Sequence, residues 1–512
     1  MSIKPFYGGR QIVRLVKSNM IKQQRDGNSN RSLIILLLII FSVSLIYAIG
    51  FRNDHNWGGD FSQYIAQAKS LSDGSIQQFI ENTTFRYEKS EDKRIGPKYY
   101  PWGFPLILAP VYHLLGFNLI AMKSFTSLFF LFSLAIIYLI FKDKICHAHN
   151  LLIVAAIAYS PYCFKFKDNI LSDMPFLFFT LLAILSIQQV ILRRNYLWND
   201  VVSYSIIGLL IFCSYTIRSS ALVLLPTLFI AQIKAYEHIR KDCEHIRLTI
   251  LKHVLPYAVF LLLTMFLIKV LPHENTYADI LSFWGADTIL GNMIYYAKLP
   301  ASFFKVLMPQ AGKIIYIITI PFVFMGIVLS FKKDYLYLVF LFFTVCLHII
   351  WPGKQGLRYI FPIMPFYLYF LVSGLNKFND FIPKLTDKTK ITIVAGLLLM
   401  ALFLATIFQS IYLQKKHNTF PQGPYHKDSV ELFHYISLNT PQDSSIVFFK
   451  PGVMMLYANR KSARIYNYEK IREHDIDYIV SNRNWNRPLK SRNHTAIFSN
   501  NSFALYEVKN LE

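Results

Sequence analysis

The sequence predicts a polytopic α-helical membrane protein that ends in a small α/β domain. Hydrophobic residues make up 54% of the 512 residues, and charged residues only 16%. The apolar residues gather into long runs within 33–413, and each run is close to the length of helix that crosses a hydrocarbon layer about 30 Å thick. In 414–512 the pattern changes to short amphipathic elements, which are typical of a domain outside the membrane.

Eleven apolar runs are predicted to cross the membrane, and the first is expected to stay as an anchor because no small-residue cleavage site follows it. A shorter segment, Trp102–Leu115, contains Pro105 and Pro110 and is predicted to be a re-entrant or interfacial helix. The eleven predicted spans are Leu33–Phe51, Leu119–Phe141, Leu151–Phe166, Met174–Leu192, Val201–Ile217, Ser219–Ile233, His253–Val270, Ile314–Phe331, Tyr335–Trp351, Tyr359–Leu375 and Ile391–Leu413.

The basic residues predict the orientation of these spans. The net charge is +23, and the cations cluster in the polar segment 1–32 and in short connections such as Lys142/Lys144, Arg193/Arg194 and Lys332/Lys333. These clusters share one side only if Trp102–Leu115 does not cross, and the positive-inside rule makes that side cytoplasmic. Cations spread over short loops do not form a basic face, so nucleic acid is not an expected partner.

The C-terminal region 414–512 is predicted to be an extracytoplasmic α/β domain. Helical periodicity runs through Asp428–Leu438, and strand-like runs follow at Ser445–Phe449, Ile476–Val480 and Ser502–Val508. The five cysteines are scattered without a Cys-x-x-Cys pair, so the sequence indicates neither a disulfide framework nor a cysteine zinc site.

The predicted orientation places several polar segments on the same outer face. The external loop 52–118 holds Asp54 and Asp60, and the sequence Gly58-Gly59-Asp60 leads into a helical pattern with Tyr64 one turn later. Asp60 could simply cap that helix, or it could accept a proton as a general base. Asp54 is a second carboxylate in the same loop and an alternative base.

Two further parts of the sequence contain cations that could bind an anion. Asp173 precedes Met174-Pro175 and suits a helix N-cap. Arg218 lies between two apolar runs and requires either a partner, such as a phosphate, or an aqueous cavity. Lys354 and Arg358 flank a glycine-containing turn, and an arginine there can hold a phosphate through two hydrogen bonds. The aromatic segment Lys98–Pro105 belongs to an interfacial belt or flanks an isoprenoid chain.

The order of these motifs resembles the GT-C glycosyltransferases, in particular the protein mannosyltransferase and aminoarabinose transferase-like branch. The resemblance covers about residues 33–413 and rests on Asp60 with Tyr64, the Pro-aromatic segment ending in Leu114-Leu115-Gly116, Ser172-Asp173-Met174-Pro175, Arg218 and Arg358-Tyr359-Ile360-Phe361-Pro362. Many members have Asp-Glu at the first motif and a Lys-Pro-Pro-like start to the interfacial helix. Here Phe61 follows Asp60 and Tyr100 precedes Pro101, with Lys98 nearby as a compensating cation.

The resemblance implies inverting transfer of a sugar from a polyprenyl-phosphate donor to a glycan, lipid or protein acceptor, at the outer face of a plasma membrane. It implies that Asp60 is the catalytic carboxylate, Asp173 the second acidic residue and Arg218 a cation near the lipid phosphate. Lys354, Arg358 and Lys98 would help to bind that phosphate, with Tyr64 and Asp54 in support. No cofactor or metal is expected. The alternatives are a transporter or flippase of lipid-linked saccharides, which would carry charges deep within spans and internal symmetry, and an inactive assembly protein.

Overall fold

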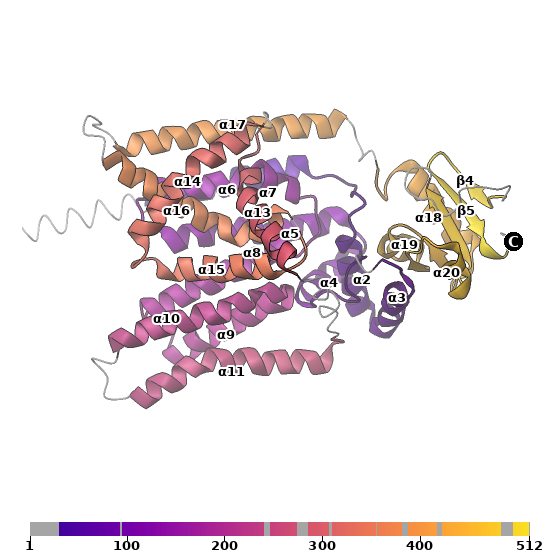
Figure 1. Ribbon diagram of the computed structural model, residues 1–512, viewed down its shortest axis with the longest axis horizontal. Coiled ribbons are helices and arrows are strands. Elements are labelled where there is room, and N and C mark those ends of the chain that lie inside the picture. Colours follow the sequence, from indigo (N-terminus) through magenta and orange to yellow (C-terminus); the bar gives the residue numbers. More distant parts are fainter. Residues whose placement is uncertain are drawn as a thin grey trace, which may run out of the picture.

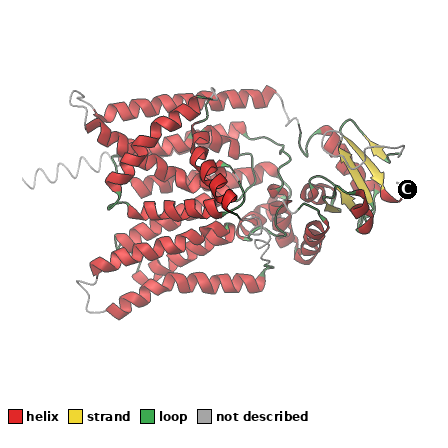
Figure 2. Ribbon diagram, in the orientation of Figure 1, coloured by secondary structure: helices red, strands yellow, loops and turns green. Residues whose placement is uncertain are grey.

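The computed structural model describes residues 30–92, 95–239, 246–273, 285–306, 310–354, 356–380, 388–416, 422–482 and 495–510. The basic segment 1–29 and parts of the loops around 240–245 and 381–387 lie outside the described residues. The long helices lie side by side in a bundle, and the described strands gather in the C-terminal domain at one end of it (Figures 1 and 2).

Nine helices in the described part of the chain are long and apolar enough to cross a membrane, so the protein is a multi-pass membrane protein as predicted. Several consist of an α-helix with a short 3₁₀ or π extension, written here as one span. The nine are Asn30–Gly50, α5 (Leu119–Phe141), α8 (Asp173–Ile187) with η2 (Gln188–Leu192), α9 (Asp200–Ile217), η3 (Ser219–Val223) with α10 (Leu224–Ile239), α11 (Ile246–Val270), α14 (Ala311–Ser330), η5 (Leu357–Ile363) with α16 (Met364–Asp380), and α17 (Lys388–Lys416).

The other two predicted spans are shorter helices. The predicted span Leu151–Phe166 is divided into α6 (His147–Ala158) and α7 (Pro161–Phe166), because Pro161 lacks the amide hydrogen needed to continue a helix and instead begins a new one. The predicted span Tyr335–Trp351 is α15 (Tyr335–Ile350), whose 16 residues rise about 24 Å. Between α11 and α14 lie α13 (Ala286–Lys298) and η4 (Leu299–Phe304).

The ambiguous proline-containing segment forms α4 (Gly103–Leu115), an interfacial helix of 13 residues that rises only about 20 Å. It packs against α2 (Asp60–Asp73) at one end of the bundle (Figure 1). Gly103 lets α4 approach the end of α9, because a Cβ atom at Gly103 would lie 2.5 Å from the carbonyl carbon of Thr216. This close contact joins the loop that contains Asp60 to the segment that contains Arg218.

The contacts at the two ends of the bundle agree with the predicted topology. Asp60 lies before α4 in the sequence and contacts Arg358, so the chain between them must cross the bundle an even number of times. Eight of the eleven predicted spans, from Leu119–Phe141 to Tyr335–Trp351, lie between the two residues. Counting α4 as a further span would make nine, an odd number. At the opposite end, Lys144 contacts Asp334 at 2.7 Å and Arg193 contacts Asp143, which gathers the basic connections there as predicted.

The C-terminal domain is a five-stranded mixed sheet with three helices. Strands β2, β1 and β3 are parallel, with Ile446 of β1 opposite Ser462 of β2 and Tyr478 of β3, and β5 and β4 extend the sheet antiparallel in the order β2-β1-β3-β5-β4. The predicted helix and three strands are present, and two short strands and two helices are additional. The elements are α18 (Lys427–Asn439), β1 (Ser445–Val447), α19 (Pro451–Ala458), β2 (Lys461–Ala463), α20 (Tyr468–Glu473), β3 (Tyr478–Asn482), β4 (Phe498–Ser499), β5 (Phe503–Glu507) and η6 (Val508–Asn510).

This domain docks on α2 and α3 (Ile76–Lys89) through an aromatic anchor and a polar clamp. The anchor is Trp57, whose ring meets the rings of Phe433, Phe448, Phe449 and Phe503 at centroid distances of 4.9 to 6.4 Å. In the clamp, the Arg464 guanidinium pairs with Asp92, and the Arg464 amide donates to Ser90 Oγ at 2.8 Å. The loop that leads to Asp60 is therefore held by the domain as well as by the bundle.

We expect Trp57→Ala to weaken docking of the C-terminal domain by about 2 to 3 kcal/mol, because it removes a partly buried ring and its aromatic contacts. Hydrogen exchange in α19 and at the start of α2 should accelerate. Trp198→Ala is a matched control, because Trp198 is 93% exposed. Unchanged exchange in α19 would show that Trp57 does not anchor the domain.

Candidate functional site

Asp60 is the first residue of α2, and its carboxylate is engaged in the site rather than in capping. Gly59 precedes it as the N-cap, and no side-chain capping bond is made. One carboxylate oxygen accepts from the Tyr100 hydroxyl at 2.7 Å, and the other accepts from both terminal nitrogens of Arg358 at 3.0 and 3.1 Å. The Asp60 side chain is 31% exposed, so this carboxylate remains accessible from solvent.

Tyr100 is positioned by the polar face of α2. The Gln67 amide donates to the Tyr100 carbonyl at 3.0 Å and accepts from the Tyr100 amide at 3.0 Å, so it holds both backbone groups of that residue. Gln63 donates to the Pro97 carbonyl at 3.1 Å and extends the same support. Burial and the negative charge of Asp60 hold the pKa of Tyr100 well above its usual value, so the phenol stays protonated and donates.

A second carboxylate–arginine pair lies beside the first. Asp173 is the first residue of α8, with Ser172 as the N-cap, and it accepts from Arg218 at 2.6 Å. The guanidinium of Arg218 lies over the ring of Tyr359, 4.7 Å from its centroid. Because the Asp173 side chain is 2% exposed and that of Arg218 is 15% exposed, each charge depends on the other for compensation.

Tyr64 and Arg358 connect the two pairs into one site. The Tyr64 hydroxyl lies 3.0 Å from Ser172 Oγ, and its ring packs against the Tyr100 ring at 4.5 Å. Arg358 interacts electrostatically with both Asp60 and Asp173. Five segments far apart in the sequence therefore meet at the end of the bundle that faces the C-terminal domain.

Three of the predicted site residues have other neighbours. Asp54 is bonded by Arg52 at 2.9 and 3.2 Å and is 4% exposed. The Lys98 ammonium lies 3.5 Å from Glu88 on α3, and that of Lys354 lies 5.6 Å from the Tyr295 ring centroid. The phosphate-binding roles of both lysines and the supporting role of Asp54 stay predictions.

Asp54 belongs to a buried polar cluster that fixes the loop after the first span. Lys123 of α5 is fully buried and donates to the carbonyls of Arg52 and Asp54, both at 2.7 Å. Asp168 accepts from the Arg52 amide at 3.0 Å and pairs with Lys167 at 2.5 Å. Because these charges bond to one another and to the backbone, the cluster orients the loop that precedes Asp60.

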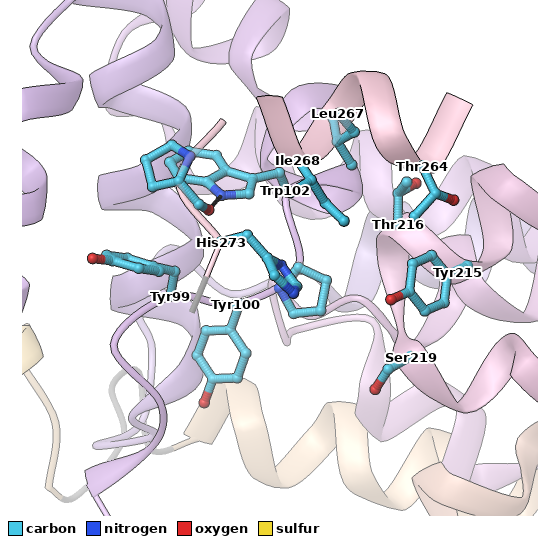
Figure 3. Close-up of a pocket in the computed structure, with 12 residues that line it drawn as sticks. Tyr99, Tyr100, Trp102, Tyr215, Thr216, Ser219, Thr264, Leu267, Ile268 and His273 are labelled. Atoms are coloured by element: carbon cyan, nitrogen blue, oxygen red, sulfur yellow. Dashed lines mark hydrogen bonds between the residues drawn. The ribbon is translucent and has the colours of Figure 1, made fainter. Parts of the chain in front are cut away.

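An aromatic-lined pocket adjoins the site (Figure 3). It lies where the segment before α4 meets the ends of α9 and α11, and Tyr100 borders both the pocket and Asp60. The aromatic segment Lys98–Pro105 thus contributes Tyr99, Tyr100 and Trp102 to the lining of this pocket. The lining residues are Tyr99, Tyr100, Pro101, Trp102, Tyr215, Thr216, Ser219, Thr264, Leu267, Ile268, Pro272 and His273.

The described residues contain no group of three or more His, Cys, Asp and Glu side chains placed to hold a metal ion. The expectation that no metal is needed stays a prediction.

Solved structures with the same architecture identify the fold. ArnT from Cupriavidus metallidurans matches with a TM-score of 0.56 at 10% identity, over 92% of this chain and 97% of that chain, both in the apo state and bound to undecaprenyl phosphate. The oligosaccharyltransferase AglB from Archaeoglobus fulgidus, in complex with an inhibitory peptide and a dolichol-phosphate, matches with a TM-score of 0.53 at 11% identity, over 87% of this chain and 69% of that chain. The fold is GT-C. No family model and no curated protein sequence matches the chain.

Tyr100 and Tyr359 are site residues of this GT-C fold that the sequence did not predict. Tyr100 donates to Asp60, and Tyr359 underlies Arg218. Tyr64 and Tyr99 lie in comparable segments, and which tyrosine reaches a carboxylate or an arginine depends on how α4 packs on α2 and η5 on α8. The one sequence feature that could have indicated Tyr359 is its position directly after Arg358.

We expect Arg218→Ala to lower the free energy of unfolding by about 3 to 5 kcal/mol, because it leaves the buried Asp173 carboxylate without its cation. The double variant Arg218→Ala/Asp173→Ala should recover part of that loss. Thermal unfolding in detergent measures both effects. Lys69→Ala, which removes an exposed pair with Asp73, is the control and should change stability by less than about 0.5 kcal/mol. A fully additive double variant would contradict the coupling.

Proposed function

We propose that this protein is a membrane glycosyltransferase that transfers a sugar from a polyprenyl-phosphate donor to an acceptor at the extracytoplasmic end of the bundle. The observation that carries the proposal is the accessible Asp60 carboxylate, held by Tyr100 and Arg358 beside the pair Asp173–Arg218. The likeness to ArnT bound to undecaprenyl phosphate and to AglB with dolichol-phosphate supports a lipid-phosphate donor.

The basic connections support this orientation. They lie at the end of the bundle opposite the site, where Lys144 and Arg193 contact carboxylates of neighbouring loops. The positive-inside rule places that end in the cytoplasm. The site and the C-terminal domain are then extracytoplasmic, at a plasma membrane.

In the proposed reaction, an acceptor oxygen attacks the anomeric carbon of the donor sugar from the face opposite the phosphate. The new bond from carbon to the acceptor oxygen forms while the bond from carbon to the phosphate oxygen breaks, and the configuration inverts. Asp60 takes the acceptor's proton, and the electron pair of the broken bond remains on the polyprenyl phosphate. Arg358 and Arg218 stabilise the charge that develops on the phosphate.

The structure suggests how donor binding would prepare the base. Arg358 uses two nitrogens to bind the Asp60 carboxylate, and a phosphate presents the same two-oxygen geometry to a guanidinium. A donor phosphate that recruits Arg358 would therefore release Asp60 from its strongest partner. With the donor in place, the carboxylate is then free to accept the acceptor's proton.

We expect Asp60→Asn to lower turnover of a radiolabelled polyprenyl-phosphate sugar by about 10² to 10⁴-fold, because the amide cannot accept the acceptor's proton. Sugar transfer by purified protein to acceptors in a membrane extract is the measurement. Asp73→Asn, at the exposed end of the same helix, should retain full turnover. If no donor is turned over but vesicles containing the protein move labelled lipid across the bilayer, the transporter alternative replaces this proposal.

We expect Arg358→Lys to raise the KM for the donor about tenfold or more, because lysine keeps the charge but loses the two-point contact. Initial rates of sugar transfer, measured over a range of donor concentrations at a fixed acceptor concentration, give the KM for the donor. Lys305→Arg provides a control substitution outside the site. An unchanged donor KM in Arg358→Lys would show that Arg358 serves only to hold Asp60.

A further inference from the structure

The C-terminal domain places a lysine over the catalytic loop. Phe449 packs on Trp57 at 4.9 Å, and Gly452 approaches Ser62 so closely that a Cβ atom there would lie 2.9 Å from Ser62 Oγ. Trp57 and Ser62 flank Asp60 in the sequence, and their partners Phe449 and Gly452 flank Lys450, so Asp60 and Lys450 lie on the two sides of the same interface. Lys450 is the N-cap residue of α19, the helix of the domain that contacts α2. Helices α19 and α2 are neighbours in Figure 1.

Lys450 differs from its cationic neighbours because it has no carboxylate partner. Arg358 pairs with Asp60, Arg218 with Asp173 and Arg464 with Asp92. Among the described residues no carboxylate lies within ion-pair distance of the half-buried Lys450 ammonium, although it interacts electrostatically with Asp60. A half-buried cation that lacks a counter-ion is an attractive position for an anionic ligand.

We propose that Lys450 binds an anionic oxygen, of the phosphate or carboxylate class, on the acceptor. This proposal rests on the proposed function and adds a substrate property to it: the acceptor carries a negative charge close to its nucleophilic oxygen. Lys450 is then a specificity residue supplied by the C-terminal domain.

The position of Lys450 favours the acceptor over the donor as the source of this anion. The aromatic-lined pocket and Arg218 lie on the bundle side of Asp60, at the ends of α9 and α11, where a membrane-embedded carrier would enter. Lys450 belongs to the C-terminal domain, which lies beyond α2 from the bundle in Figure 1. A donor phosphate held on the bundle side leaves Lys450 for the second substrate.

Burial and the positive charge of Arg464 lower the pKa of Lys450 below its usual value, while Asp60 raises it. An anion bound at Lys450 would offset the first two effects and keep the ammonium charged. A half-buried ammonium that burial and a neighbouring cation destabilise binds an anion more strongly, which agrees with the geometric argument.

The kinetic test separates the two substrates. Lys450→Gln should raise the KM for the acceptors in the membrane extract about tenfold and leave the KM for the donor unchanged. Lys450→Arg should restore the KM for the acceptors. The control is Lys427→Gln on α18 of the same domain, whose side chain is 84% exposed. An unchanged acceptor KM in Lys450→Gln overturns the proposal, and so does a rise in the donor KM instead.

A binding test works without turnover and therefore distinguishes failure of this proposal from failure of the proposed function. Protein in nanodiscs is acylated at its lysines, and the modification rates of Lys450 and Lys427 are followed by mass spectrometry. Inorganic phosphate in the buffer should slow modification of Lys450 only, whereas polyprenyl phosphate in the nanodisc should not. Protection by polyprenyl phosphate alone, or by neither probe, overturns the proposal. Protection by inorganic phosphate supports the anion site even in a preparation that turns over no donor.

Discussion

The pair between Asp60 and Arg358 is the interaction on which the arrangement of the rest of the chain depends. It joins residues 298 positions apart, and each charge would be costly so close to the membrane without the other. To bring them together, the intervening chain must cross the bundle an even number of times, and α4 must stay at the interface. The pair therefore couples the membrane topology to the chemistry of the site.

Helix α2 converts this topology into a shaped site because its two sides have different tasks: Asp60, Gln63 and Gln67 lie on one side and Ser62 on the other. Its first residue, Asp60, enters the ion pair, and Gln63 and Gln67 hold the backbone of the segment that ends in Tyr100. The side near Ser62 receives the C-terminal domain at Gly452. A short helix with low overall hydrophobicity is thus the common support of the aromatic pocket, the carboxylate and the docked domain.

Nine of the eleven predicted spans correspond to long apolar helices among the described residues, because hydrocarbon thickness acts on whole segments, and the basic connections Lys144 and Arg193 lie at the end of the bundle opposite the site. The same reasoning excluded Trp102–Leu115 as a span and grouped Asp60, Asp173, Arg218 and Arg358. It did not predict which carboxylate pairs with which arginine, or that Lys98 turns to Glu88. Those outcomes depend on side-chain directions in irregular segments, where no periodicity constrains them. Lys450 carried no sequence signal at all, since its position depends on how two domains dock.

Charge conservation explains why paired carboxylates and arginines suit the proposed reaction. The donor phosphate is a diester with one negative charge, and it becomes a monoester with two as the sugar leaves. In the same step Asp60 takes the acceptor's proton and loses its own charge, while the phosphate that has recruited Arg358 gains one. The net charge of the site stays constant while the negative charge moves from the carboxylate to the phosphate. A guanidinium that already contacts the phosphate can stabilise its second charge with little reorganisation of the surrounding protein.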